Sequence, residues 1–150
     1  MVAAFRRFHA HAEARMKPAL QALEGLDLAG RSRVARIDAD LEALGLAGSR
    51  PCDPTLPLPP GQALGWFYVV EGSSLGGHVI LRTFSDAGID KLGLSFLDPY
   101  GDAVGARWRE VVAVLDREVA SGRVDQDDVL QGALAAFDYA YAVLTPPPDE

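Results

Sequence analysis

Residues 66–80 read Trp-Phe-Tyr-Val-Val-Glu-Gly-Ser-Ser-Leu-Gly-Gly-His-Val-Ile, an apolar run of helical character that contains three glycines. A glycine in a helix interior costs about 1 kcal/mol relative to alanine, so three of them call for a purpose. Gly72 and Gly76 are four residues apart and share one face, with Gly77 beside them. The pattern predicts a helix interrupted by a bare strip of backbone. A planar ligand could lie there or a second helix could approach closely, and spacing alone favours helix packing.

The composition indicates a single domain. The chain has 150 residues, of which 49% are hydrophobic, and this suffices for one ordinary core. The net charge of −7 argues against nucleic acid or an anionic membrane surface as the main partner, because both require a basic face. Cys52 is the only cysteine, which excludes an internal disulfide and any multi-thiolate metal site.

The first twenty residues do not read as a targeting segment, and the expected location is the cytoplasm. No apolar run reaches the roughly 18 to 20 residues of a membrane span. Charged side chains stand where a signal peptide has its apolar centre: Arg6, Arg7, Glu13, Arg15 and Lys17.

Apolar positions recur at helical spacing, and no stretch sustains the alternation of a strand, which predicts an all-α fold. Residues 50–61 contain five prolines and are expected to form an extended strap across the bundle. The expected helices cover residues 1–23, 31–44, 62–84, 102–121 and 125–144.

Helix ends can be assigned from capping residues. Asp102 is expected to be an N-cap, Gly122 to end that helix, and Asp125 or Asp127 to begin the last one. The last helix should present one apolar face, made of Val129, Leu130, Ala133, Leu134, Phe137, Tyr141 and Leu144.

The usual catalytic patterns are absent from the sequence, which has no HExxH and no paired thiolates. His9 and His11 are two residues apart on a helix and diverge by about 200°, so they cannot face one metal. A surface position is expected for both, although one could point inward. His78 follows the glycine pair and could reach a ligand there, but a solvated or core histidine is the commoner outcome.

Two arginines accompany the aromatic residues that follow the glycine helix. Arg107 and Arg109, near Tyr100 and Trp108, could clamp a carboxylate of a ligand. As arginines on a helix surface they need no such role.

The segment 67–77 resembles the distal-helix motif of the heme oxygenase superfamily, especially the bacterial branch found beside bacteriophytochrome genes. Phe96, the pair Tyr100-Gly101 and Trp108 resemble the aromatic element that follows this helix. The resemblance covers most of the chain, because residues 5–44 look like the family's second and third helices and residues 133–144 like its last.

The resemblance implies a multi-helix bundle in which a kinked, glycine-rich helix passes over heme, which is both cofactor and substrate. It implies oxidation of heme to biliverdin, carbon monoxide and iron, an electron donor such as ferredoxin or flavodoxin, and a bacteriophytochrome as recipient of biliverdin. Ser73 or Ser74 would orient a water; many relatives outside the branch have aspartate where this chain has Ser73. The implied catalytic positions are Gly72, Ser73 and Gly76, and the implied heme contacts are Tyr68, Gly72, Gly76, Gly77, Tyr100 and Arg107.

The resemblance departs from the family at the amino end. The family's proximal histidine lies on a helix ahead of the one that residues 1–23 resemble, so the domain of residues 1–150 is expected to be truncated there or to have lost heme ligation. The iron ligand is then unassigned; His9 or His11 could substitute, although their helix would lie elsewhere in the family fold. A missing pocket wall would leave an apolar patch that invites oligomerisation.

Two further function classes remain open. One is a non-catalytic heme-binding or structural relative of the fold. The other is a thiaminase-like helical hydrolase, which is weakened because Cys52, the only thiol available as nucleophile, lies in the proline-rich connector.

Overall fold

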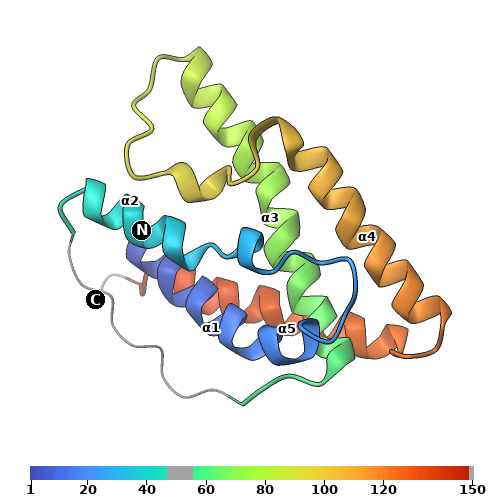
Figure 1. Cartoon of the computed structure of the whole chain (residues 1–150). Helices are drawn as coiled ribbons and strands as arrows, with labels where there is room; N and C mark the ends of the chain where they lie inside the picture. The colour runs from blue at the N-terminus through green and yellow to red at the C-terminus, as the bar shows by residue number, and fades with distance from the viewer. Residues whose placement is uncertain (47–55, 149–150) are drawn as a thin grey trace.

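The computed structural model describes residues 1–46 and 56–148, and their secondary structure is helical throughout, which confirms the all-α prediction (Figure 1). None of the described helices is both long and apolar enough to cross a membrane. The α-helices are α1 (Val2–Leu20), α2 (Val34–Ala43), α3 (Pro60–Asp86), α4 (Val104–Ala120) and α5 (Gln126–Leu144), and the short 3-10 helices are η1 (Ala29–Arg31), η2 (Ser95–Leu97) and η3 (Gly101–Ala103).

Helix α3 organises the bundle, because α1, α4 and α5 all pack against it (Figure 1). The main core lies where these helices meet, and a smaller core joins α1 and α2 to the segment after α3. Buried side chains of the main core include Phe8, Met16, Leu20, Leu58, Leu64, Trp66, Phe67 and Val70, and those of the smaller core include Ile37, Leu41 and Phe96.

The most extensive contact between two helices is the crossing of α3 and α5. A Cβ atom on Gly65 would overlap the α5 backbone at Val129 and Ala133, and one on Gly132 would overlap the α3 backbone at Gln62. The two glycines therefore let the helix backbones touch. Close packing on glycine was expected at residues 72–77 and occurs there at Gly77, against Leu97 of η2. It also occurs at the pair Gly65 and Gly132, which the sequence did not single out.

Helix α3 is helical from Pro60 to Asp86 without a break, so the prediction that glycines interrupt it is wrong. Packing on α1, α4 and α5 outweighs the glycine cost. The helix begins inside the predicted strap, with Pro60 in its first turn, where a missing N–H costs nothing. Part of the strap, residues 50–55, lies outside the described residues. In the described part Leu58 is buried and its N–H donates to the Arg15 carbonyl oxygen at 3.0 Å, as a strap requires.

The second helix begins at Val34, three residues later than predicted. Ser32 is extended, with ψ of 129°, and this ends η1 before α2 can start. The helix therefore leaves both Arg31 and Arg33 in the connecting segment, and both side chains are buried.

The capping predictions are partly right. Asp125 is the N-cap of α5 and accepts a hydrogen bond from the Asp127 N–H at 2.8 Å. Asp102 lies in η3 and caps nothing, since α4 starts after Ala103 without a side-chain cap. Gly122 follows α4 with φ of 75°, as expected of a helix stop.

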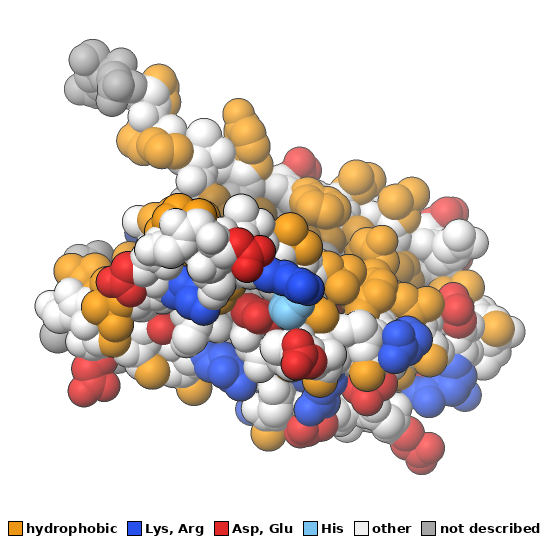
Figure 2. All heavy atoms as spheres, turned by 90° about the horizontal axis from the view of Figure 1, so that it is seen from above, with side chains coloured by type: hydrophobic (Ala, Val, Ile, Leu, Met, Phe, Trp, Pro, Cys, Tyr) orange, Lys and Arg blue, Asp and Glu red, His pale blue; other side chains and the backbone are white. Residues whose placement is uncertain are grey.

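The predicted apolar face of α5 is not a core face, because much of it is open to solvent. The buried side of α5 is built on Gly132 and Ala136. Hydrophobic side chains gather over a broad region of the surface seen in Figure 2. The large exposed side chains of α5 are Leu130, Leu134, Phe137 and Tyr141, between 55% and 74% exposed.

Candidate functional site

A hollow of about 430 Å³ opens where α1, α4 and α5 meet the outer face of α3, and we call it the α3 hollow. Its wall is dominated by apolar and aromatic side chains, as is typical of small-molecule and cofactor sites. The lining residues are Phe5, Phe8, His9, Tyr68, Val69, Gly72, Ser73, Leu75, Trp108, Phe137, Ala140 and Leu144.

The three glycines of the motif face different surroundings. A Cβ on Gly72 would lie 3.5 Å from the Trp108 ring, which is an ordinary contact, and one on Gly76 would have nothing within 4 Å. A Cβ on Gly77 would overlap the carbonyl group of Leu97. Gly76 therefore leaves open space, whereas Gly77 is required for packing.

Tyr68 and Trp108 form an aromatic wall of the hollow. Their ring centroids are 5.2 Å apart and the ring planes are tilted by 53°. Tyr68 is 43% exposed, so its ring is available to a ligand. The prediction placed Tyr68 among ligand contacts, and the structure brings it beside Gly72 and Ser73.

The two serines of the motif point to different places. Ser73 lines the hollow, and its hydroxyl donates to the Val70 carbonyl oxygen at 2.5 Å. Ser74 is buried and donates to the Glu71 carbonyl oxygen at 2.6 Å. Because the Ser73 proton is committed to Val70, its oxygen meets the hollow as a hydrogen-bond acceptor.

His9 is buried at the wall of the hollow, so the expected surface position is wrong. Its ring is 3% exposed, and its Nδ1 atom has no hydrogen-bond partner in the described part of the chain. Burial and, to a smaller extent, the positive charge of Arg33 lower the pKa of His9 to about 3. The imidazole is therefore neutral near pH 7.

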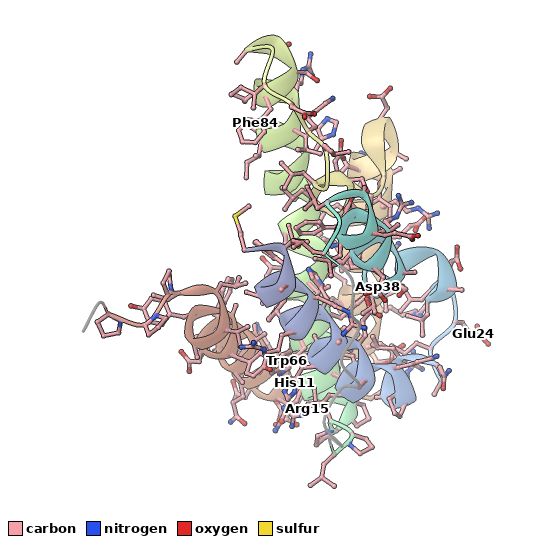
Figure 3. The ribbon with its side chains drawn as sticks, turned by 90° about the vertical axis from the view of Figure 1, so that its left-hand side faces the viewer. His11, Arg15, Glu24, Asp38, Trp66 and Phe84 are labelled. Carbon is pink, nitrogen blue, oxygen red and sulfur yellow. The ribbon has the colours of Figure 1, made fainter. Side chains whose placement is uncertain are left out.

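His11 is partly buried on another side of α1. Its ring stacks on Tyr139 with centroids 4.1 Å apart, and it lies beside Trp66 together with Arg15 (Figure 3). Burial and then the charge of Arg15 lower the pKa of His11. His9 and His11 diverge as predicted, and His11 does not line the hollow.

His78 is not at the hollow. Its Nδ1 lies 3.0 Å from both carboxylate oxygens of Asp98, and Asp98 also accepts from the Gly101 N–H at 3.2 Å. This histidine therefore fastens the segment after α3 to the helix.

A buried ion cluster surrounds Glu71 of α3, and it was not predicted from the sequence. The Glu71 carboxylate accepts from Arg31 at 2.6 Å and from the Tyr100 hydroxyl at 2.8 Å, and Arg33 lies 3.5 Å away. Burial raises the pKa of the Tyr100 hydroxyl, and the neighbouring Glu71 raises it further. Glu71 itself could have indicated this cluster, because it is a charged residue on the same face of α3 as Phe67. A carboxylate buried on that face needs cationic partners.

Tyr100 and Arg107 belong to this side of the molecule. The Arg107 guanidinium lies 5.5 Å from the centre of the Tyr100 ring. Neither residue lines the α3 hollow, and neither does Gly77. The structure thus brings Tyr68, Gly72 and Ser73 together at the α3 hollow. Gly76 follows Leu75 at the open edge of this hollow, and the other predicted ligand contacts lie away from it.

The chain is similar to a protein of Xanthomonas campestris pv. campestris (strain 8004) named heme oxygenase. The two are 34% identical over 120 residues, which cover 76% of this chain and 68% of the relative. No protein-family model matches the chain. No solved structure matches it.

Proposed function

Because the chain belongs to the heme oxygenase family, we propose that it binds heme in the α3 hollow and oxidises it to biliverdin, carbon monoxide and iron. The observation that carries the proposal is an apolar hollow that meets α3 at Gly72 and Ser73, beside the open space at Gly76.

The residues of the hollow fit a planar, largely apolar macrocycle. Leu75 and Val79, on the same side of α3 as Gly72, are 36% and 62% exposed and extend the apolar surface beyond the hollow. A side chain at Gly76 would occupy the space that such a ligand needs. When bound, heme supplies the iron that activates dioxygen and the ring that is oxidised.

Ser73 has a defined part in this proposal. Its oxygen can accept a hydrogen bond from a water in the hollow, and that water then has a second proton to donate toward a ligand. Gly72 keeps the neighbouring backbone free of side-chain bulk. In this proposal Ser73 orients a hydrogen-bond-donating water, a part that does not require an aspartate at position 73.

The iron ligand is assigned by the resemblance to a helix ahead of the one that matches α1, and we keep this assignment in the proposal. His9 is the imidazole that the described residues offer at the hollow. It is neutral, as a metal ligand must be, but its ring lies inside the core next to Phe8, at 5.2 Å between centroids. Ligation by His9 would require the ring to leave that packing.

The remaining parts of the proposal follow the family. They are an electron donor such as ferredoxin or flavodoxin and a bacteriophytochrome as recipient of biliverdin. The charged first twenty residues add a cytoplasmic location, and the exposed apolar surface adds self-association. The alternative of a non-catalytic heme-binding relative shares the hollow and differs only in turnover. The thiaminase-like alternative would need Cys52 as its nucleophile, and Cys52 lies outside the described residues.

The proposal is tested with Gly76→Leu, which fills the space at the open edge of the hollow. We expect heme affinity, measured from the Soret band, to fall at least about tenfold while stability stays within about 1 kcal/mol. Ala113→Leu, an exposed position on α4 away from the hollow, is the matched control and should bind heme as the parent does. Unchanged heme binding by Gly76→Leu would place the ligand elsewhere.

Turnover separates the enzyme from the non-catalytic relative. With ascorbate as reductant and catalase present, a heme oxygenase should form biliverdin, seen by its red absorption, whereas a binding protein should retain its heme unchanged.

A further inference from the structure

A second hollow, of about 330 Å³, lies between α2, the end of α3 and the segment that follows it. We call it the basic hollow. Leu81, nine residues after Gly72, lines it, and at 100° per residue this places it on the opposite face of α3 from the α3 hollow. Its polar lining residues are Arg36, Arg82, Ser85, Lys91, Ser95 and Asp98.

Three cations converge on the basic hollow from three separate elements. Arg36 belongs to α2, Arg82 to α3, and Lys91 to the segment after α3. Within the described ranges, none of the three forms an ion pair, whereas Arg6 pairs with Asp38. The chain has a net charge of −7, yet the lining of this hollow carries three positive side chains and one negative side chain, Asp98, so its local charge is positive and attracts anions.

The carboxylates near the hollow are already engaged in holding the fold. Asp98 accepts from His78 and from the Gly101 N–H. Asp40 accepts from the Ser95 hydroxyl at 2.8 Å and from the Phe96 N–H at 2.8 Å. These hydrogen bonds fix the segment that carries Lys91 and Ser95. Asp98 is the carboxylate among the lining residues, and it offsets part of the charge of the three cations.

Donors remain available for a ligand. The Lys91 ammonium donates to the Ser85 oxygen at 2.6 Å, which leaves the Ser85 proton free to donate elsewhere. Arg36 and Arg82 add two guanidinium forks, whose geometry matches oxyanions. The site therefore offers four donor groups around one space.

We propose that the basic hollow binds a phosphate-type oxyanion with two or more negative charges, such as the phosphate end of a phosphorylated small molecule. The volume admits a diphosphate group, and the open side leaves the rest of such a molecule in solvent. This site is separate from the α3 hollow, so it stands whether or not heme binds.

The test is a titration of the whole chain with pyrophosphate, followed by backbone amide shifts in ¹⁵N–¹H spectra at constant ionic strength. We expect saturable shifts for Ser85, Lys91 and Ser95 that potassium chloride does not reproduce. Shifts that fail to saturate, or that chloride reproduces, would overturn the proposal. A hexaglutamate peptide that bound more tightly than pyrophosphate would also overturn it, because the surface would then serve an acidic protein.

Variants localise the site. Arg82→Gln should weaken pyrophosphate binding about tenfold, Arg82→Lys should weaken it less, and Arg7→Gln on α1 should leave it unchanged. The spectra themselves report whether each variant is folded. Equal affinity in Arg82→Gln and in the parent chain would show that the hollow is not the binding site.

Discussion

Arg31 Nη1 lies 2.6 Å from Glu71 Oε2, and each of the two side chains is 2% exposed. The pair joins the segment between α1 and α2 to the middle of α3. Desolvation makes such a pair expensive to form, and the loss of one partner leaves the other charge buried without compensation. Glu71 compensates two buried arginines, since Arg33 lies next to it as well.

Glu71→Gln should therefore be strongly destabilising. The expected loss is about 3–5 kcal/mol in the free energy of unfolding, measured by urea denaturation, because Arg31 and Arg33 lose their shared counter-charge. The control is Glu110→Gln, which removes a partner of Arg31 that is 49% exposed and should cost about 1 kcal/mol or less. Equal costs for the two variants would mean that the cluster is solvated.

Folding stability should depend on pH through His9. The pKa is about 3 in the folded chain and 6.5 in the unfolded chain, so between these values only the unfolded chain binds the proton. Stability should therefore fall as the pH falls from 6.5 toward 3, by up to about 1.4 kcal/mol per pH unit. His9→Leu should reduce this dependence in urea titrations at pH 6.5, 5.5 and 4.5, leaving the part that His11 contributes.

His11→Gln is the matched control for the pH experiment. His11 lies on the same helix, and its pKa is also lowered, so it adds to the slope in the same direction. A chain with His11→Gln should still lose stability on acidification because it keeps His9. If His9→Leu leaves the slope unchanged, the imidazole is not buried in the neutral form.

Gly76 and Gly77 should respond differently to alanine. Gly77→Ala would place a methyl group in the Leu97 carbonyl and should cost about 2–4 kcal/mol. Gly76→Ala meets open space and should raise stability by about 1 kcal/mol through helix propensity. Thermal unfolding followed by circular dichroism compares the two, and similar changes in both would contradict the separate surroundings described for them.

Hemin titration should give a broad Soret band of a loosely ligated species, because His9, which lines the α3 hollow, has its ring packed in the core next to Phe8. His9→Leu should leave this spectrum unchanged. A sharp six-coordinate imidazole spectrum that disappears in His9→Leu would identify His9 as the iron ligand and refute the assignment.

The helices could be predicted from the spacing of apolar residues, but the surroundings of each face could not. Leu134 and Phe137 recur at helical spacing, and this pattern fits a core face as well as an exposed one; the structure leaves both more than half exposed. His9 was within reach of the sequence, because it lies on the same face of α1 as Ala12 and Met16, both buried.

The site was predictable only where its residues are neighbours in the chain. Gly72 and Ser73 share one helix, so their spacing fixes their relation. The partners of Glu71 come from residues 31, 33 and 100, and no local pattern relates positions this far apart. The prediction that Tyr100 and Gly72 contact the same ligand was based on residues far apart in the chain, and the structure places only Gly72 at the α3 hollow.

The contact of Gly65 with α5 also limits how the molecule can move. Because a side chain on either glycine would overlap the opposing backbone, α5 cannot slide along α3 by a turn without driving a larger residue into this crossing. Phe137 and Leu144 line the α3 hollow farther along α5. The glycine pair that holds the two backbones in register therefore also sets where these two side chains stand along α3, and with them the position of one wall of the hollow.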